Sequence, residues 1–131
     1  MEQVEFEIST IIAAPAQEIY AAWLDSARHA AMTGAAAHCS DQVGGSFEAW
    51  DGYISGVNLA LEPGLRIVQS WRTVEFSAAD PDSLIEVTLL AVAGGTSLTL
   101  RHSNLPEHGW QYEQGWVDSY FEPMKEYFAR S

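Results

Sequence analysis

The chain has 131 residues, of which 18 are acidic and six are basic, so its formal net charge is −12. This charge disfavours nucleic acid and anionic membrane surfaces as partners, because both select for clustered Lys and Arg. A hydrophobic content of 47 % with five Trp argues against disorder, and the length fits a single domain over residues 1–131.

Two features bear on the compartment. The single cysteine, Cys39, cannot form an internal disulfide, which fits a reducing environment. The first seven residues lack the basic-then-apolar order of a signal peptide, and no apolar run reaches the length of a membrane span. The sequence therefore predicts a soluble cytoplasmic protein.

The N-terminal part is predicted to form one strand and two short helices. Apolar Val4, Phe6 and Ile8 alternate with polar neighbours, as in a half-buried strand that continues to about residue 12. Pro15 suits the first position of a helix that ends near residue 25. Ser26 can cap a second helix that ends near residue 32.

From residue 44 to residue 103, strand patterns alternate with turn signals. The turns are Asp51-Gly52, residues 62–65 and Gly94-Gly95, and residues 77–83 have the composition of an exposed loop. The predicted strands cover residues 46–50, 53–61, 66–75, 84–92 and 96–103. With the first strand, these segments predict an antiparallel sheet of about six to seven strands.

Residues 105–131 predict one long amphipathic helix with an aromatic face. On a wheel of about 100° per residue, one half is filled by Trp110, Trp116, Val117, Tyr120, Phe121, Met124, Tyr127 and Phe128. Glu113 projects into that half, either near a wet helix end or into a cavity under the helix. Pro123 removes the backbone hydrogen bond to the Ser119 carbonyl and should kink the helix there.

The order of these elements predicts an α+β fold. A run of antiparallel strands with helices on one side is most simply packed as a curved sheet wrapped around the final helix. Because bulky aromatic side chains hold the two layers apart, we expect a cavity between the sheet and the helix.

Several segments resemble one family. The segments Gly44-Gly45-x-Phe47 and Asp51-Gly52-Tyr53-Ile54-Ser55-Gly56 resemble the G-G-x-F and D-G-x-x-x-G segments of heat-shock-protein-90 ATPase activator domains. Similar to other motifs of that family are Leu61-Glu62-Pro63, Ile67-Val68-x-x-Trp71-Arg72 and Gly115-Trp116-x-x-x-Tyr120-Phe121-Glu122-x-x-Lys125, in which Ser119 replaces an aromatic residue. The segment Pro15-x-x-x-Ile19-Tyr20-x-x-Trp23 resembles the opening helix of the START-like, helix-grip superfamily.

The resemblance implies a helix-grip (START-like) fold over nearly the whole chain, and it leaves three functions open. The first is a protein that binds a small, mainly apolar or aromatic molecule between sheet and helix. The second is a co-chaperone that binds a heat-shock-protein-90-type chaperone and stimulates its ATPase. The third is an enzyme of the cyclase or dehydratase type. The first is preferred, because the helix face is aromatic and no compelling catalytic set is present; no cofactor is expected.

The candidate ligand-binding residues are His102, Trp110, Glu113, Trp116 and Tyr120. Pairing the hairpin through Gly94-Gly95 sets Val87 opposite His102 and points His102 toward the helix. This histidine is either bonded to a neighbouring carbonyl or hydroxyl, or it forms a polar pair with Glu113 in the cavity. In an enzyme, either member of that pair is the candidate general acid or base.

A second group of residues contains metal-ligand types. His29, His38, Cys39 and Asp41 are near one another in sequence, but their spacing matches no metal motif. We therefore expect no metal site.

Overall fold

An antiparallel sheet forms one layer of the structure. The computed structural model describes residues 4–130, so residues 1–3 and 131, which belong to the N-terminal segment and the predicted last helix, lie outside the described residues. The strands follow the order β1-β6-β5-β4-β3-β2. They are β1 (Val4–Ile12), β2 (Ser46–Ala49), β3 (Ile54–Glu62), β4 (Arg66–Thr73), β5 (Ser83–Val92) and β6 (Gly95–Leu105).

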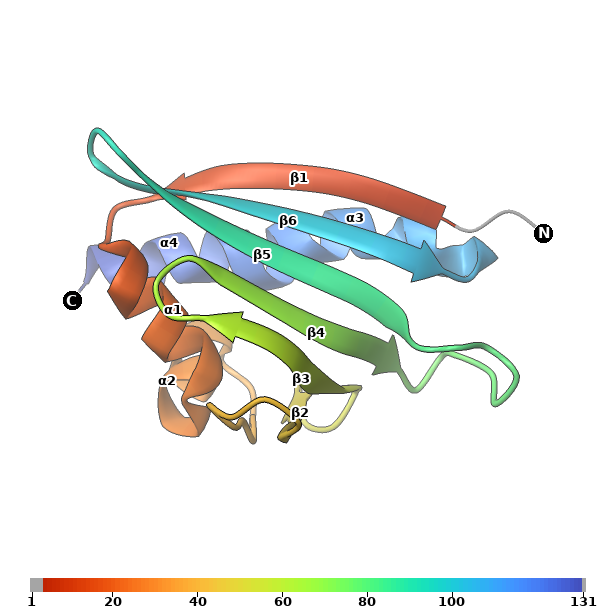
Figure 1. Ribbon diagram of the computed structural model, residues 1–131. Helices are drawn as coiled ribbons and strands as arrows, with labels where there is room; N and C mark the ends of the chain where they lie inside the picture. Colours follow the sequence, from red (N-terminus) through yellow and green to blue (C-terminus); the bar gives the residue numbers. More distant parts are fainter. Residues whose placement is uncertain (1–3, 131) are drawn as a thin grey trace.

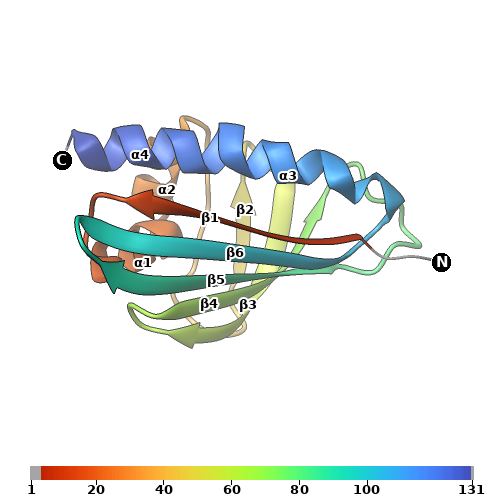
Figure 2. The ribbon, with the colours of Figure 1, turned by 90° about the horizontal axis from the view of Figure 1, so that it is seen from above.

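The helices cover one face of this sheet. Figures 1 and 2 show a long C-terminal helical segment running along the sheet, with the two early helices α1 (Ala16–Leu24) and α2 (Ser26–Thr33) near its C-terminal end. The long segment comprises the 3-10 turn η1 (Glu107–Trp110), α3 (Gln111–Trp116), the π-helical segment η2 (Val117–Phe121) and α4 (Glu122–Ala129). The α+β helix-grip fold predicted from the sequence is thereby confirmed.

The predicted strands are found, and their ends lie within about two residues of the predicted ends.

The cap predicted for α2 was wrong, because Asp25 and not Ser26 caps this helix. The Asp25 carboxylate accepts a hydrogen bond from Arg28 N at 2.9 Å. Ser26 Oγ instead accepts from Cys39 N at 2.8 Å and so ties α2 to the following loop.

The register of the β5–β6 hairpin also differs from the prediction. Ile85, not Val87, lies opposite His102, because the turn residues are Ala93 and Gly94 and the last pair is Val92 with Gly95. The expected register was therefore displaced by two positions. Since side chains alternate with a period of two, the displacement leaves every residue on its predicted face, and His102 does point into the core.

The C-terminal helix differs from the ideal wheel used to predict its buried face. Its buried stripe has a spacing of four residues: Tyr112, Trp116, Tyr120, Met124 and Phe128. On an ideal α-helix, side chains four apart are offset by about 40°, so such a stripe would turn away from the sheet. The π-helical segment accommodates an additional residue per turn and keeps the stripe on one face.

Pro123 coincides with this change in helix type. It lies in the first turn of α4, directly after the π-helical segment, in which Glu122 N donates to Val117 O. A five-residue π-helical segment thus lies directly before Pro123, and the kink expected at this proline stays a prediction.

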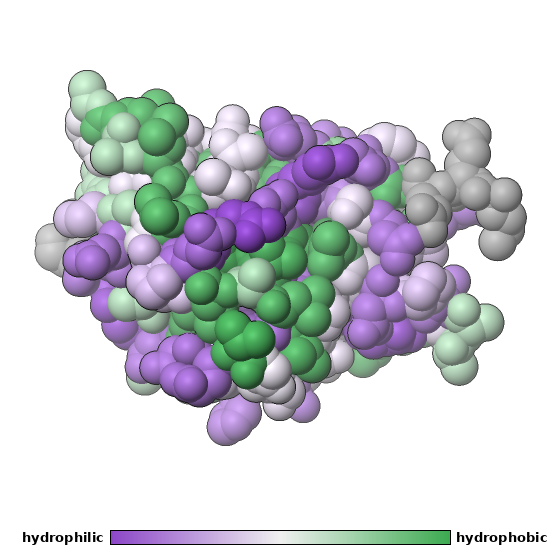
Figure 3. Space-filling view, in the orientation of Figure 1, coloured by the Kyte–Doolittle hydropathy of each residue, from purple (hydrophilic) through white to green (hydrophobic). Residues whose placement is uncertain are grey.

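The core lies between the sheet and the helix. Ile12, Ile67, Val87, Leu98 and Leu100 from the strands are fully buried there. The outer side is mixed: Figure 3 shows a hydrophilic band beside apolar side chains, and the exposed apolar residues of the strands include Ile11, Leu59 and Leu90. Among the described residues, no helix is long and apolar enough to cross a membrane.

A buried polar network inside this core connects α1 with the middle of the sheet. Trp23 Nε1 donates to Gln69 Oε1 at 3.3 Å, and Gln69 Nε2 donates to Asn58 Oδ1 at 2.8 Å. Asn58 Nδ2 then donates to the carbonyls of Ser40 and Gln42. Because each amide of this network finds partners, the loop before β2 is held against β3 without an unpaired buried amide.

The two Trp residues of the last segment provide a matched test of this packing. Trp116 is 3 % exposed and Trp110 is 57 % exposed. Trp116→Ala should lower the free energy of unfolding by about 3–5 kcal/mol, as truncation of a large core side chain does. Trp110→Ala should cost less than about 1 kcal/mol. Urea unfolding of both variants measures this, and equal losses would contradict the helix orientation.

Candidate functional site

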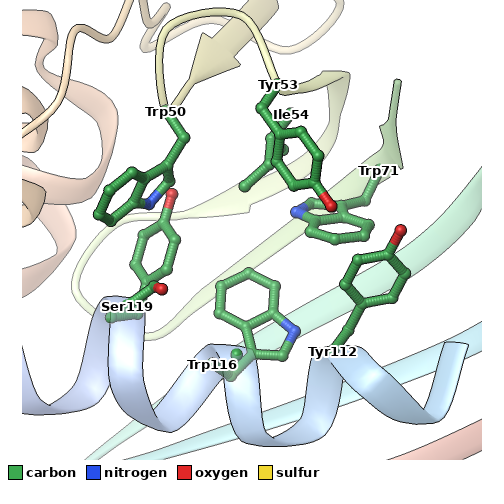
Figure 4. A pocket seen from close by; sticks show the side chains of 9 residues that line it. Trp50, Tyr53, Ile54, Trp71, Tyr112, Trp116 and Ser119 are labelled. Carbon is green, nitrogen blue, oxygen red and sulfur yellow. The ribbon is translucent and has the colours of Figure 1, made fainter. Parts of the chain in front are cut away.

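A cavity lies between the C-terminal helix, the turn that follows β2, and the strands β3 and β4. It has a volume of about 180 Å³ and is partly open to solvent. Its lining is formed by Trp50, Tyr53, Ile54, Trp71, Tyr112, Gly115, Trp116, Ser119 and Tyr120. Figure 4 shows these side chains facing one another from the two layers. None of them carries a charge at neutral pH, so the site is an aromatic cavity.

The sheet side of the cavity is formed around the turn that follows β2. Trp50 and Tyr53 flank the turn residues Asp51 and Gly52. The side chains of Trp50 and Tyr53 both lie over the helix (Figure 4). The Tyr53 hydroxyl donates to the Glu75 carboxylate and thereby connects the turn with the loop after β4. Trp71, on β4, forms the floor beside them.

The helix side combines large and small residues. Tyr112, Trp116 and Tyr120 point toward the sheet, and the rings of Trp116 and Tyr120 are 4.8 Å apart. Gly115 and Ser119 lie between them, and a Cβ atom added at Gly115 would meet no atom within 4 Å. The cavity therefore exists where these two small residues face Trp50 and Tyr53.

His102 lies behind this wall and holds it in place. Trp116 Nε1 donates to His102 Nδ1 at 3.0 Å, so the proton of the imidazole is on Nε2. Nε2 then donates to Ser83 Oγ at 2.9 Å, and Ser83 Oγ donates to Trp71 O at 2.6 Å. Burial lowers the pKa of His102 to about 3, which keeps the ring neutral. This is the bonded-histidine alternative of the two that the sequence left open.

Tyr120 is fixed in a similar way by a second buried histidine. His29 Nδ1 lies 2.7 Å from the Trp23 carbonyl and must donate to it, which leaves Nε2 to accept from the Tyr120 hydroxyl at 2.8 Å. Burial lowers the pKa of His29 and raises the pKa of Tyr120, so the pair is neutral. Tyr112 is held by a 2.6 Å hydrogen bond between its hydroxyl and Thr73 Oγ1.

Three of the five predicted site residues do not line the cavity: His102 lies behind its wall, and Trp110 and Glu113 are exposed. Trp110 is exposed and packs its ring near Phe6, because the 3-10 turn η1 gives it a different orientation from the α-helix that follows. Glu113 is exposed on the outer side of α3, since the buried stripe begins at Tyr112. Glu113 therefore forms no pair with the fully buried His102, and the expected polar or catalytic pair was wrong.

Trp116 and Tyr120 do line the cavity, but sequence reasoning missed most of their neighbours. Tyr112 could have been found from its spacing of four residues before Trp116. Trp50 and Tyr53 could have been found from their positions on either side of the Asp51-Gly52 turn signal.

None of the metal-ligand residue types lines this cavity, although His29 binds the hydroxyl of the lining residue Tyr120. Among the described residues, no group of three or more His, Cys, Asp or Glu side chains could hold a metal ion. His29 is occupied by Trp23 and Tyr120, and His38 forms an isolated β-bridge with Glu48. Burial raises the pKa of the Cys39 thiol to about 11, so this cysteine is protonated at neutral pH.

Comparison with known proteins identifies the family. The family model described as "Activator of Hsp90 ATPase homolog 1-like protein" matches residues 13–129. The match covers most of the chain, and the chain belongs to this family.

Individual relatives agree with this assignment. An uncharacterized protein of Schizosaccharomyces pombe is 33 % identical over 119 residues, which are 88 % of this chain and 34 % of that protein. A Dictyostelium discoideum protein is named activator of 90 kDa heat shock protein ATPase homolog. It is 30 % identical over 95 residues, which are 70 % of this chain and 24 % of the length of that protein. The chain thus spans about a third or less of these relatives.

A solved structure shows the same fold. The crystal structure of an HSP90 activator from Plasmodium falciparum superposes with a TM-score of 0.84 at 23 % sequence identity. The superposition covers 92 % of this chain and 93 % of that one.

The neutral, buried His102 predicts a pH dependence of stability. The unfolded chain takes up a proton at this side chain below pH about 6.5, whereas the folded chain does so only near pH 3. Above pH about 6.5 the histidine adds no pH dependence. Below it, the free energy of unfolding should fall by up to about 1.4 kcal/mol per pH unit on its account.

His102→Gln removes the titrating ring and should flatten this part of the profile. The measurement is a set of urea titrations of both proteins between pH 4 and pH 8. The comparison at pH 8 gives the separate cost of the lost hydrogen bonds. Parallel profiles of the two proteins below pH about 6.5 would contradict the assignment of His102 as buried and neutral.

Proposed function

We propose that this member of the Activator of Hsp90 ATPase homolog 1-like family binds a small, mainly aromatic molecule in the cavity between its sheet and its C-terminal helix. The aromatic cavity is the observation that carries the proposal. Ligand sites are typically concave and lined by apolar and aromatic side chains with a few polar groups. This lining has that composition.

The size of the cavity limits the ligand. An engineered cavity of about 150 Å³ lined by apolar side chains holds benzene, and the cavity here measures about 180 Å³. A single substituted ring or a compact two-ring molecule fits this space, and a larger ligand would extend through the open side. Flat rings also suit the walls, because aromatic pairs favour stacked and edge-to-face contacts.

The rigidity of the walls supports the same function. Tyr112, Trp116 and Tyr120 each have their polar atom in a buried hydrogen bond to a partner outside the cavity. These bonds fix the rings with their apolar faces toward the empty space. Because little side-chain freedom remains to be lost on binding, such a site is preorganised for a ligand.

A screen for ligand-induced stabilisation tests the proposal directly. The melting temperature is measured with a panel of one-ring and two-ring aromatic compounds, with aliphatic compounds of equal size as controls. A ligand at a hundred times its Kd adds about 2.7 kcal/mol to the free energy of unfolding, which raises the melting temperature by several degrees. If no aromatic compound stabilises the protein, the proposal is wrong.

A second candidate function is stimulation of a heat-shock-protein-90-type chaperone. The observation that favours it is the name of the Dictyostelium relative, an activator of 90 kDa heat shock protein ATPase homolog. The net charge of −12 would suit a basic surface on the chaperone. The test is the ATPase rate of the chaperone with and without this protein, and an unchanged rate would remove this candidate.

A larger side chain that fills the cavity should abolish ligand binding and leave the stability of the fold nearly unchanged. Ser119 is half-buried and lines the cavity, so Ser119→Phe places a ring in the space that the ligand would occupy. We expect loss of aromatic-ligand binding, while the free energy of unfolding stays within about 1 kcal/mol or rises, as with other cavity-filling changes. Ser9→Phe, the same change at an exposed strand position, is the control and should bind normally. A folded Ser119→Phe variant with unchanged affinity would place the ligand elsewhere.

A further inference from the structure

The polar atoms of the cavity lining differ in whether a ligand can reach them. Four of the lining side chains already bond to the protein through their hydroxyl or indole groups: Tyr53, Tyr112, Trp116 and Tyr120. Within the part of the chain that the structure describes, the polar side-chain atoms of the lining without a partner are Trp50 Nε1, Trp71 Nε1 and Ser119 Oγ.

The Trp50 nitrogen is out of reach of a ligand. The protein encloses it almost completely, and it is the one buried side-chain nitrogen or oxygen of residues 4–130 that is both enclosed and unpaired. Its turn is strained, because Trp50 and Asp51 have φ values of 54° and 59°, in the left-handed region that side chains other than Gly rarely adopt. Asp51 N donates to Ala36 O at 3.0 Å and holds this turn. Trp50 therefore gives the cavity an apolar wall and no hydrogen bond.

The Trp71 nitrogen, in contrast, faces open space. The Trp71 residue is only 3 % exposed and its Nε1 has no hydrogen bond, yet the protein does not enclose this nitrogen as it encloses Trp50 Nε1. Figure 4 shows the indole nitrogen of Trp71 pointing toward the middle of the side chains that line the cavity. Because buried donors are nearly always paired, this N–H requires an acceptor in the cavity.

Trp71 lies at the inner end of the cavity. The lining residues that are half-buried mark the open side: Trp50, Tyr53, Gly115 and Ser119. The Ser119 hydroxyl on that side can turn to donate or to accept, so it does not select for one kind of ligand group. The Trp71 N–H can only donate, and it therefore sets the chemistry at the inner end.

We propose that the ligand of this cavity is an aromatic molecule with an uncharged hydrogen-bond acceptor, an aryl ketone or aldehyde in the simplest case, and that the Trp71 indole N–H donates to that acceptor at the inner end. This inference rests on the function proposed above. The acceptor is uncharged because no lining residue carries a positive charge, so an anion beside Trp71 would be buried without a counterion.

Two probes of nearly the same shape test the donor. Acetophenone and α-methylstyrene differ only in C=O against C=CH2. Their Kd values are measured by NMR titration for the parent protein and for the variants Trp71→Phe, Trp50→Phe and Ser119→Ala. The ratio of the two Kd values is compared between proteins, so the different hydration of the two compounds cancels.

Trp71→Phe should shift this ratio against acetophenone by about five- to tenfold, the effect expected for one neutral hydrogen bond. Trp50→Phe is the matched control, because it makes the same change in the same lining at a nitrogen that the ligand does not reach, and its ratio should equal that of the parent protein. Ser119→Ala should also leave the ratio unchanged. An unshifted ratio in Trp71→Phe, or an equal shift in either other variant, overturns the inference.

A direct measurement in the parent protein does not depend on how well a variant folds. The Trp71 indole N–H signal is assigned from nuclear Overhauser contacts with the neighbouring rings of Tyr112 and Trp116, which lie 4.9 Å and 5.6 Å from the Trp71 ring. It should move further downfield with acetophenone than with α-methylstyrene, whose ring affects the signal in the same way. Equal shifts with the two compounds overturn the inference.

The outcomes also separate this inference from the proposed function. If aromatic compounds without an acceptor bind and acetophenone does not, the inference is overturned and the proposed function stands. If no aromatic compound binds, both are overturned.

Discussion

The hydrogen bond from Trp116 Nε1 to His102 Nδ1 connects the two layers of this protein at its centre. It is 3.0 Å long and fully buried, and it continues through Ser83 to the Trp71 carbonyl. A neutral histidine is needed for it, because only an unprotonated Nδ1 accepts. The surrounding apolar side chains meet this need by disfavouring the charged ring, so the packing of the core and the orientation of Trp116 depend on each other.

The cavity follows from this arrangement. The hydrogen bonds of Trp116, Tyr120 and Tyr112 hold three large rings at fixed positions on the helix, and Gly115 and Ser119 leave space between them. Close packing would normally fill such a space, since interiors contain few voids. Here the facing residues cannot move in, because Trp50 is held by its turn and Trp71 by its strand. The small residues of the helix and the fixed rings of the sheet thus maintain the space jointly.

Much of the fold could be predicted from the sequence, because it depends on periodic patterns and turn residues. The alternation of Val4, Phe6 and Ile8, the Asp51-Gly52 turn and the breadth of the last aromatic stripe all led to the correct layers. The site could be predicted only in part. The ideal wheel placed Trp110 and Glu113 in the buried half, because neither the 3-10 turn before α3 nor the π-helical segment can be read from apolar periodicity alone. Trp50 was missed because its placement depends on contacts between the Asp51 turn and Ala36, which are distant in sequence.

The residues that carried the family resemblance are also residues of the cavity. Tyr53, Trp71, Gly115, Trp116 and Tyr120 all lie in the quoted motifs, and all line the cavity. A purely structural role would account for the large rings, since they fill the space between the layers. It accounts less well for a strained turn that buries an indole N–H without a partner, because both features cost stability. Folding alone would favour a relaxed turn or a paired side chain at Trp50. The two small helix residues, Gly115 and Ser119, likewise leave unfilled a space that close packing would remove, as the proposed binding of an aromatic molecule requires.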